Sequence, residues 1–291
     1  MSLLTDIARA KVNLTLRVHG RRADGYHELE SLVAFADCAD TLALEPASGL
    51  KLTATGPGAP ECGDGDDNLV IRAARALGER IAGLKAGHFT LEKHLPVAAG
   101  IGGGSADAAA ALRLLARANG IDPRDPRVVE VARATGADIP VCLQSRACTM
   151  SGVGENLSFL NLPALPCVMV NPRIAVATKD VFAALGLAKG EAFGSGRQSP
   201  SWPSGTATVE QWCEAIAAGT NDLEPPALKV EPAIGVVLAA LRASAGIRFA
   251  RISGSGATCF GIFRNAGDAE QAAKAISRQH SGWWVHVGTL S

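Results

Sequence analysis

The feature that most constrains the fold of this chain is a glycine-rich segment that runs directly into an apolar helix. Four of the five residues in 100–104 are glycine, and Ser105 follows them. The next stretch, 108–118, is rich in Ala and Leu and apolar on nearly every side, so we expect a helix buried in the core. Glycines ahead of a helix present backbone N–H groups at the positive end of the helix dipole. The segment therefore predicts a phosphate-binding site.

Two better-known phosphate motifs do not fit this segment. No Lys-Ser or Lys-Thr pair follows the glycines, as one does in a P-loop. The third glycine of a dinucleotide-binding fingerprint would fall on Ser105. The remaining alternative is a tight turn that lets a helix pack closely, for which one or two glycines would suffice.

Composition narrows the class of protein. The 291 residues include 28 Lys and Arg against 28 Asp and Glu, so the chain lacks the basic surplus of a non-specific nucleic-acid binder. Its seven cysteines are odd in number and form no C-x-x-C motif, so we expect reduced, mostly buried thiols. The longest apolar run, 232–241, is far shorter than the roughly 18 residues of a membrane span. We expect a soluble cytoplasmic protein with no nucleic acid, membrane or obligate protein partner.

Hydrophobic periodicity predicts an α+β fold. Strict alternation over 10–18 predicts a half-buried strand, with Lys11 and Asn13 on its polar face. The other predicted strands are 29–35, 41–44, 50–54, 88–93, 166–171, 249–253, 258–263 and 283–287. The predicted helices are 70–81 (with Asp67 or Asn68 as N-cap), 108–118, 127–134, 178–187, 209–218, 234–244 and 269–279. The simplest division gives two α+β domains, 1–160 and 161–291, and the polar loop 194–206 is the segment expected to be most mobile.

Three further features could carry chemistry, and each is weak alone. Lys11 beside Asn13 on a strand is usually a solvated edge. Asp138, among small and apolar residues ahead of Pro140, reads equally well as a helix N-cap or as a general base that a lysine keeps ionised. The Gly and Ser run 253–258 offers a second set of backbone donors of the kind used around phosphates.

In combination these segments resemble the three motifs of the GHMP kinase superfamily. The motifs are Ala-x-Ala-Lys-x-Asn-Leu at 8–14, the glycine-rich segment at 96–109 and Ser-Gly-Ser-Gly-Ala-Thr at 253–258, in that order. The resemblance spans nearly the whole chain and implies a two-domain α+β fold with the active site in the cleft between the domains. The segments 22–27, 67–69 and 136–140 are similar to the branch of the superfamily that uses ATP to phosphorylate the 2-hydroxyl of a cytidine diphosphate-linked polyol on a route to isoprenoids.

The resemblance also implies roles for single residues. Asp138 would be the general base that accepts the proton of the attacking hydroxyl, and Lys11 would hold Asp138 ionised and stabilise charge at the γ-phosphate. ATP, carrying Mg²⁺ with ligands left unknown, would be bound by Asn68 at adenine and by Pro96, Val97, Ala98, Ala99, Gly100, Ile101, Gly102, Gly103, Gly104, Ser105 and Ala106 around the phosphates. The small-molecule substrate would be bound by Asn13, Tyr26, His27 and Phe182, and for Phe182 an ordinary core position is the alternative.

The chain departs from the usual motifs at several positions. Arg9 stands where Pro is common, Ile101 where Leu is common, and Ala106-Asp107 where Ser-Asn is more usual. Asp107 places a carboxylate in the first turn of the helix, where it would repel phosphate unless it points away or meets Mg²⁺. Two other functions stay open: a superfamily kinase for a small alcohol such as mevalonate or homoserine, and a nucleotide-binding regulator that has lost catalysis.

Overall fold

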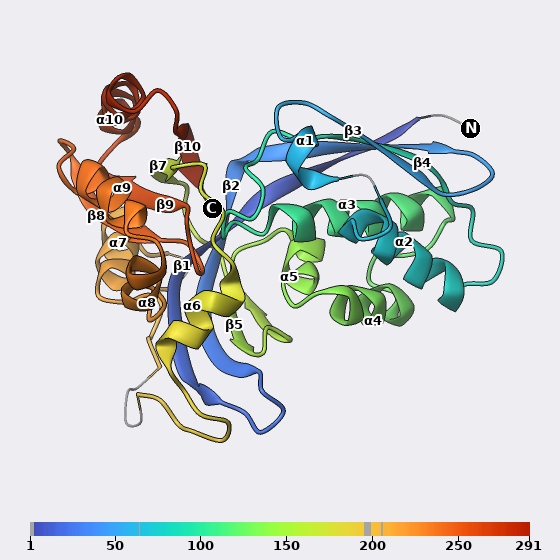
Figure 1. Ribbon diagram of the computed structural model, residues 1–291, viewed down its shortest axis with the longest axis horizontal. Helices are drawn as coiled ribbons and strands as arrows, with labels where there is room; N and C mark the ends of the chain where they lie inside the picture. Colours follow the sequence, from blue (N-terminus) through green and yellow to red (C-terminus); the bar gives the residue numbers. More distant parts are fainter. Residues whose placement is uncertain (1–2, 64, 195–198, 205) are drawn as a thin grey trace. The chain divides into compact units, whose positions relative to one another are not determined.

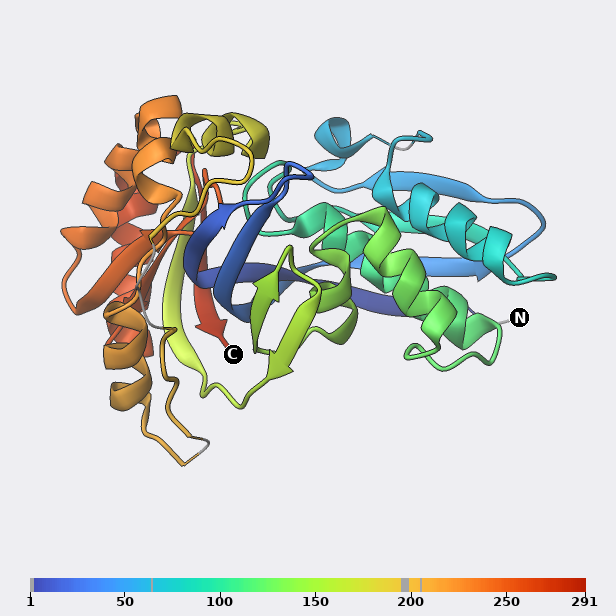
Figure 2. The same ribbon diagram turned by 90° about the horizontal axis from the view of Figure 1, so that it is seen from below.

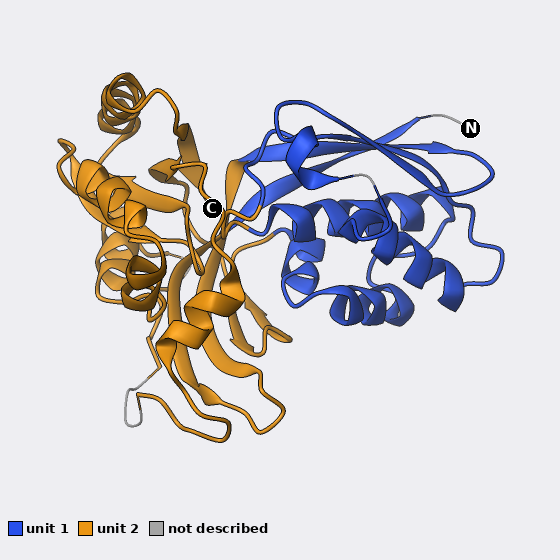
Figure 3. Ribbon diagram, viewed as in Figure 1, with its two compact units in different colours: residues 1–11, 38–97, 102–145 blue, residues 12–37, 98–101, 146–291 orange. Residues whose placement is uncertain are grey.

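The computed structural model describes residues 3–63, 65–194, 199–204 and 206–291, and its elements form two compact units (Figure 3). The units consist of residues 1–11, 38–97 and 102–145 (unit 1) and of residues 12–37, 98–101 and 146–291 (unit 2). The chain passes between the units several times. This division therefore differs from the contiguous domains 1–160 and 161–291, whose boundaries stay a prediction.

Two long strands, β1 (Leu4–Arg21) and β2 (His27–Pro46), contribute to both units and pair with each other. The predicted half-buried strand at 10–18 is wrong in one respect, because its polar face is buried as well: Lys11, Asn13 and Thr15 are almost fully covered. The strands predicted at 29–35 and 41–44 are one continuous strand. Residues 36–40, which contain Asp37 and Asp40, lie between the two predicted strands and do not interrupt β2.

Unit 1 combines a sheet with helices on one of its sides (Figure 1). Strand β3 (Lys51–Thr55) runs parallel to β4 (Gly87–Glu92), and β4 is antiparallel to the last part of β2. The helices of this unit are α1 (Ala59–Cys62), α2 (Leu69–Arg80), α3 (Gly103–Ala118), α4 (Pro126–Thr135) and α5 (Ile139–Gln144). The almost wholly apolar α3 packs against α2 and α5, and the expectation that it is buried is confirmed.

Unit 2 contains an antiparallel sheet in the order β10-β7-β9-β8, in which β10 (red) lies beside β7 (yellow-green) in Figure 2. Besides parts of β1 and β2, the strands of unit 2 are β5 (Cys148–Gly152), β6 (Asn156–Phe159), β7 (Leu165–Asn171), β8 (Ile247–Ile252), β9 (Cys259–Phe263) and β10 (Trp284–Leu290). Its helices are α6 (Thr178–Leu185), α7 (Val209–Ala217), α8 (Glu224–Val230), α9 (Ala233–Arg242) and α10 (Ala266–Gln279). Helices α9 and α10 pack on the sheet, and β5 pairs with β2.

The main differences from the predicted elements concern short segments and one helix start. Helix α3 begins at Gly103 instead of residue 108, so Asp107 lies beyond its first turn. The short elements α1, α5, α8, β5 and β6 are absent from the sequence prediction. Residues 195–198 and 205 of the loop predicted to be most mobile lie outside the described residues.

The cysteines and the helices bear on two other expectations. None of the seven cysteines forms a disulfide, and five of them are buried, which confirms the expectation of mostly buried thiols. Within the described ranges, no helix combines the length and the apolar character that crossing a membrane requires.

Candidate active site

The centre of the candidate site is an ion pair between Lys11 and Asp138 in unit 1. The Nζ of Lys11 lies 2.9 Å from Oδ2 of Asp138, and 5% of the lysine side chain and 34% of the aspartate side chain are exposed. Asp138 occupies the N-cap position of α5, yet its side chain accepts no capping hydrogen bond. The N-cap reading of Asp138 therefore holds for its backbone position only, and its carboxylate instead faces Lys11 and solvent.

Gly102 places the start of helix α3 against this pair. It is the N-cap of α3 with φ +62°, and a Cβ at this position would lie 3.3 Å from Lys11 and 3.9 Å from Oδ2 of Asp138. The first N–H groups of a helix have no partner inside the helix, so they are available to an anion. Unit 1 thus brings a carboxylate, an ammonium group and a helix N-terminus together.

The first half of the glycine-rich segment is held in unit 2 by the Ser-Gly run near the C-terminus. A Cβ on Gly100 would lie 2.6 Å or less from the carbonyl oxygens of Ser253 and Gly256, so only glycine fits here. Ser253 Oγ donates to the carbonyl of Gly100 at 2.9 Å and accepts from the backbone N–H of Asn13 at 3.1 Å. Residues from all three sequence motifs therefore meet around one buried serine hydroxyl.

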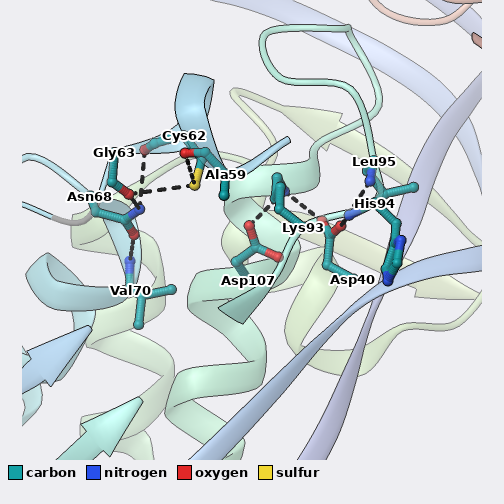
Figure 4. A network of polar contacts seen from close by, with 10 residues as sticks. All are labelled: Asp40, Ala59, Cys62, Gly63, Asn68, Val70, Lys93, His94, Leu95 and Asp107. Carbon is teal, nitrogen blue, oxygen red and sulfur yellow. Dashed lines mark hydrogen bonds and ion pairs between the residues drawn. The ribbon is translucent and has the colours of Figure 1, made fainter. Parts of the chain in front are cut away.

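The structure gives two of the predicted binding residues a structural task. The amide of Asn13 is buried and donates to Oγ of Ser31 at 2.7 Å. Asn68 caps α2 by accepting from the N–H of Val70 at 2.9 Å, and its amide donates to the carbonyls of Cys62 and Gly63 (Figure 4). Their contacts with substrate and adenine stay predictions.

The predicted cytidine-binding residues lie in unit 2, and two of them are in contact. The rings of His27 and Phe182 stack with centroids 4.3 Å apart and an angle of 24° between their planes, while Tyr26 is 64% exposed. Burial, and secondarily the charge of Arg21, lowers the pKa of His27, so its imidazole is neutral at neutral pH. Its Nε2 is buried and has no hydrogen-bond partner among the described residues. A neutral imidazole with an unused ring nitrogen can read the edge of a base.

Sequence reasoning missed a buried ionic triad in unit 1, formed by Asp40 of β2, Lys93 after β4 and Asp107 of α3 (Figure 4). The Nζ of Lys93 donates to Oδ2 of Asp40 and, at 2.7 Å, to Oδ2 of Asp107. All three side chains are almost completely covered. The carboxylate of Asp107 thus pairs with Lys93, a partner that the sequence analysis did not name.

The triad is buried and has one ammonium group for two carboxylates, and both facts affect its protonation. Burial raises the pKa of Asp107 to about 7; the charge of Lys93 opposes this rise and the charge of Asp40 adds to it. The pKa of Lys93 is raised by the two carboxylates, whose effect outweighs the cost of burying its charge. Lys93 is therefore charged, and Asp107 exchanges its proton near neutral pH.

A sequence signal for the triad existed in the alternation of β4. Gly87, Phe89 and Leu91 point to the core, and the same period of two places Lys93 on the buried side. On β2 the buried positions Leu44 and Leu42 alternate with more exposed ones, and the same period of two places Asp40 on the buried side. Charged residues at two buried positions of neighbouring strands indicate a paired network.

Two family models match the chain. The model of the GHMP kinases N terminal domain matches residues 68–146, and the model of the GHMP kinases C terminal matches residues 207–282. Together they cover more than half of the chain. The fold is that of a GHMP kinase, and the chain belongs to the GHMP kinase family.

Relatives that match over nearly the whole length of the chain show which branch of the GHMP kinases it belongs to. The chain is 65% identical over 291 residues to the 4-diphosphocytidyl-2-C-methyl-D-erythritol kinase of Rhodopseudomonas palustris, covering 99% of this chain and 97% of the relative. It is 63% identical to the enzyme of the same name from Nitrobacter hamburgensis, covering 99% of this chain and 96% of the relative. The chain belongs to the 4-diphosphocytidyl-2-C-methyl-D-erythritol kinase family.

Solved structures agree with this assignment. A crystal structure of 4-(cytidine 5'-diphospho)-2C-methyl-D-erythritol kinase superposes with a TM-score of 0.74 at 36% identity and covers 99% of both chains. A homoserine kinase from Cytophaga hutchinsonii superposes with a TM-score of 0.69 at 18% identity, covering 100% of this chain and 95% of that chain. The second likeness concerns the fold alone.

Proposed function

We propose that this chain transfers the γ-phosphoryl group of ATP to the 2-hydroxyl of 4-diphosphocytidyl-2-C-methyl-D-erythritol, giving the 2-phosphate and ADP in the methylerythritol phosphate route to isoprenoids. The observation that carries the proposal is the Lys11–Asp138 pair at 2.9 Å, beside the residue that starts the glycine-rich helix. It joins the groups that phosphoryl transfer to an alcohol requires.

In this proposal Asp138 orients the attacking hydroxyl and accepts its proton. The hydroxyl oxygen forms a bond to the γ-phosphorus while the bond from that phosphorus to the bridging oxygen of ADP breaks. The ion pair with Lys11 favours the ionised form of Asp138 and so keeps it able to accept the proton. A carboxylate is a weak base, but phosphoryl transfer passes through a loose transition state, so positioning contributes more than basicity.

The phosphates of ATP are assigned to the glycine-rich segment. Residues 96–106 supply backbone N–H groups and the N-terminus of α3, which favour anionic oxygens. Among the described residues, no group of three or more His, Cys, Asp or Glu side chains could hold a metal ion by itself. An Mg²⁺ ion held chiefly by the phosphates fits this donor set, and it would neutralise charge that develops on the phosphoryl oxygens.

The cytidine end of the substrate is assigned to Tyr26, His27 and Phe182. A pyrimidine base offers a flat face for aromatic stacking and a polar edge for hydrogen bonds. The exposed ring of Tyr26 can stack on the face of the base, and the unused Nε2 of His27 can form a hydrogen bond with its edge. A simple alcohol substrate would have no use for either group. Cysteines that form no disulfide suit the reducing cytoplasm, where we place the enzyme.

The test is release of ADP from Mg-ATP with 4-diphosphocytidyl-2-C-methyl-D-erythritol, in parallel with mevalonate, homoserine and no acceptor. We expect ADP with the cytidyl substrate only. Equal rates with a simple alcohol would overturn the substrate assignment, and ATP binding without ADP release with any acceptor would indicate a regulator. Asp138→Asn should lower kcat on the order of 10³-fold while the affinity for the nucleotide changes little. Unchanged turnover would remove Asp138 from the mechanism.

A further inference from the structure

We propose that Asp40, Lys93 and Asp107 act as positioning residues for the nucleotide. They fix the two ends of the glycine-rich segment to each other: its entry, the residues directly ahead of Pro96, and its exit, the first turn of α3. The inference rests on the proposed function, because it assumes that this segment binds ATP. The buried triad has no role in the predicted site or in the proposed mechanism, and this inference gives it one.

The entry of the segment is fixed by Asp40. Its Oδ1 accepts hydrogen bonds from the backbone N–H groups of His94, at 2.6 Å, and of Leu95, at 2.8 Å, directly ahead of Pro96. Both bonds are charge-assisted, which makes them stronger than bonds between neutral groups. The other oxygen of the same carboxylate binds Lys93. One side chain of β2 therefore holds three consecutive residues at the start of the segment.

The exit of the segment is fixed by Asp107 through Lys93. Asp107 lies on α3 four residues after its first residue, Gly103, and binds the Nζ of Lys93 at 2.7 Å. The same Nζ lies 3.2 Å from where a Cβ on Gly103 would be. The ammonium group thus touches the first turn of α3, whose N–H groups are assigned to the phosphates. The triad links the strand before the segment to the helix after it.

Stability alone does not account for this arrangement. Burying three charged groups is costly, and apolar side chains of similar volume stabilise such a position as well or better. What apolar packing does not provide is hydrogen bonding that fixes two backbone segments at defined distances. A phosphate cradle needs such fixed donors, because small displacements weaken each bond to the anion.

The experiment measures the dissociation constant of Mg-ADP by calorimetry on the full-length protein, with KM for the cytidyl substrate as the second readout. Lys93→Met keeps the stem of the side chain and removes its charge. We expect the dissociation constant to rise about tenfold or more, with KM for the cytidyl substrate within about twofold of wild type. If Lys93→Met does not fold, Asp107→Ala removes the acceptor on α3 and retains the Asp40–Lys93 bond, and we expect it to weaken nucleotide binding about threefold.

A conservative replacement at Asp40 separates positioning from simple stability. Asp40→Asn keeps an oxygen that can accept from His94 and Leu95, whereas Asp40→Ala removes it. We expect Asp40→Asn to bind Mg-ADP more tightly than Asp40→Ala. The matched control is Arg117→Met, which removes another ion pair of α3, with Asp6 at 3.2 Å, and should leave the nucleotide affinity unchanged.

Several results would overturn the inference. One is a folded Lys93→Met or Asp107→Ala variant that binds Mg-ADP as wild type does. The others are an equal rise in the dissociation constant of Mg-ADP and in KM for the cytidyl substrate, and identical behaviour of the two Asp40 variants. Failure of the proposed function is a separate result, because it would appear in the wild-type protein as the absence of nucleotide binding or of turnover.

Discussion

Gly102 lies against the side chain of Lys11 so closely that an added methyl group would approach both Cβ and Cε of the lysine to 3.3 Å. Lys11 in turn holds Asp138 at 2.9 Å. The N-cap glycine of helix α3 therefore leaves the space that the side chain of Lys11 occupies beside Asp138. Its missing side chain is a steric requirement of the candidate site.

Gly102→Ala should damage turnover through this contact. The backbone at φ +62° disfavours any Cβ by about 1 kcal/mol or more, and the methyl group must also displace Lys11. We expect kcat to fall by about tenfold, measured by ADP release with the cytidyl substrate. Gly120→Ala is the matched control, because Gly120 has φ +66° and nothing within 4 Å of its Cβ position. It should lose similar stability and keep its kcat. Equal losses of kcat in both variants would show that strain, and not the contact with Lys11, is responsible.

Phe182→Ala should affect the acceptor substrate selectively. The ring stacks on His27 at 4.3 Å, and an aromatic pair contributes about 0.5–1.5 kcal/mol beyond simple burial. We expect KM for the cytidyl substrate to rise about three- to tenfold, with KM for ATP unchanged. Leu185→Ala, on the same helix and against the same core, controls for lost packing. If the two variants raise KM equally, Phe182 is a core residue, which is the alternative that its helical position leaves open.

The regular helices could be predicted from the sequence because each has one apolar face. The predicted helices 70–81, 127–134 and 209–218 are confirmed as Leu69–Arg80, Pro126–Thr135 and Val209–Ala217. Short elements such as α5 and α8 are too brief to show a period, and each carries proline near its start. Their positions depend on tertiary packing, which a local pattern does not contain.

Polar residues that bind partners far away in the chain show the other limit of the sequence. Asp37 and Asp40 look like an interruption of β2, but Asp37 accepts from the N–H of Thr289 at 3.0 Å and Asp40 binds Lys93. Each partner is distant in the chain, so no local window reveals it. Lys11, Asp138 and the glycine-rich segment could be predicted as candidate site residues because each lies in a contiguous motif. The alternation along β2 and β4 marks Asp40 and Lys93 as buried, but their pairing with Asp107 of α3 is a contact between distant elements that no contiguous motif contains.

The triad also predicts how stability depends on pH. Two thiols, those of Cys62 and Cys142, also interact electrostatically with Asp107, in addition to Lys93 and Asp40. Burial raises the pKa of both thiols, so they stay neutral. The pKa of Asp107 is raised from its ordinary value of 3.8 to about 7 in the folded protein. The folded state therefore binds this proton more tightly than the unfolded state does. The resulting stability is complete below about pH 4 and is lost as the pH rises through 7.

Asp107→Asn removes this titration, because an amide does not ionise. At pH 5 the wild-type carboxyl is protonated and resembles the amide, whereas at pH 8 wild type bears a buried charge in excess. We expect the variant to gain stability relative to wild type between these pH values by on the order of 2 kcal/mol, measured by urea unfolding. Asp125→Asn is the control, since the pKa of Asp125 is lowered to about 2 and its titration ends well below pH 5. A difference between Asp107→Asn and wild type that stays constant from pH 5 to pH 8 would mean that Asp107 is ionised throughout, and the protonation assigned to the triad would then be wrong.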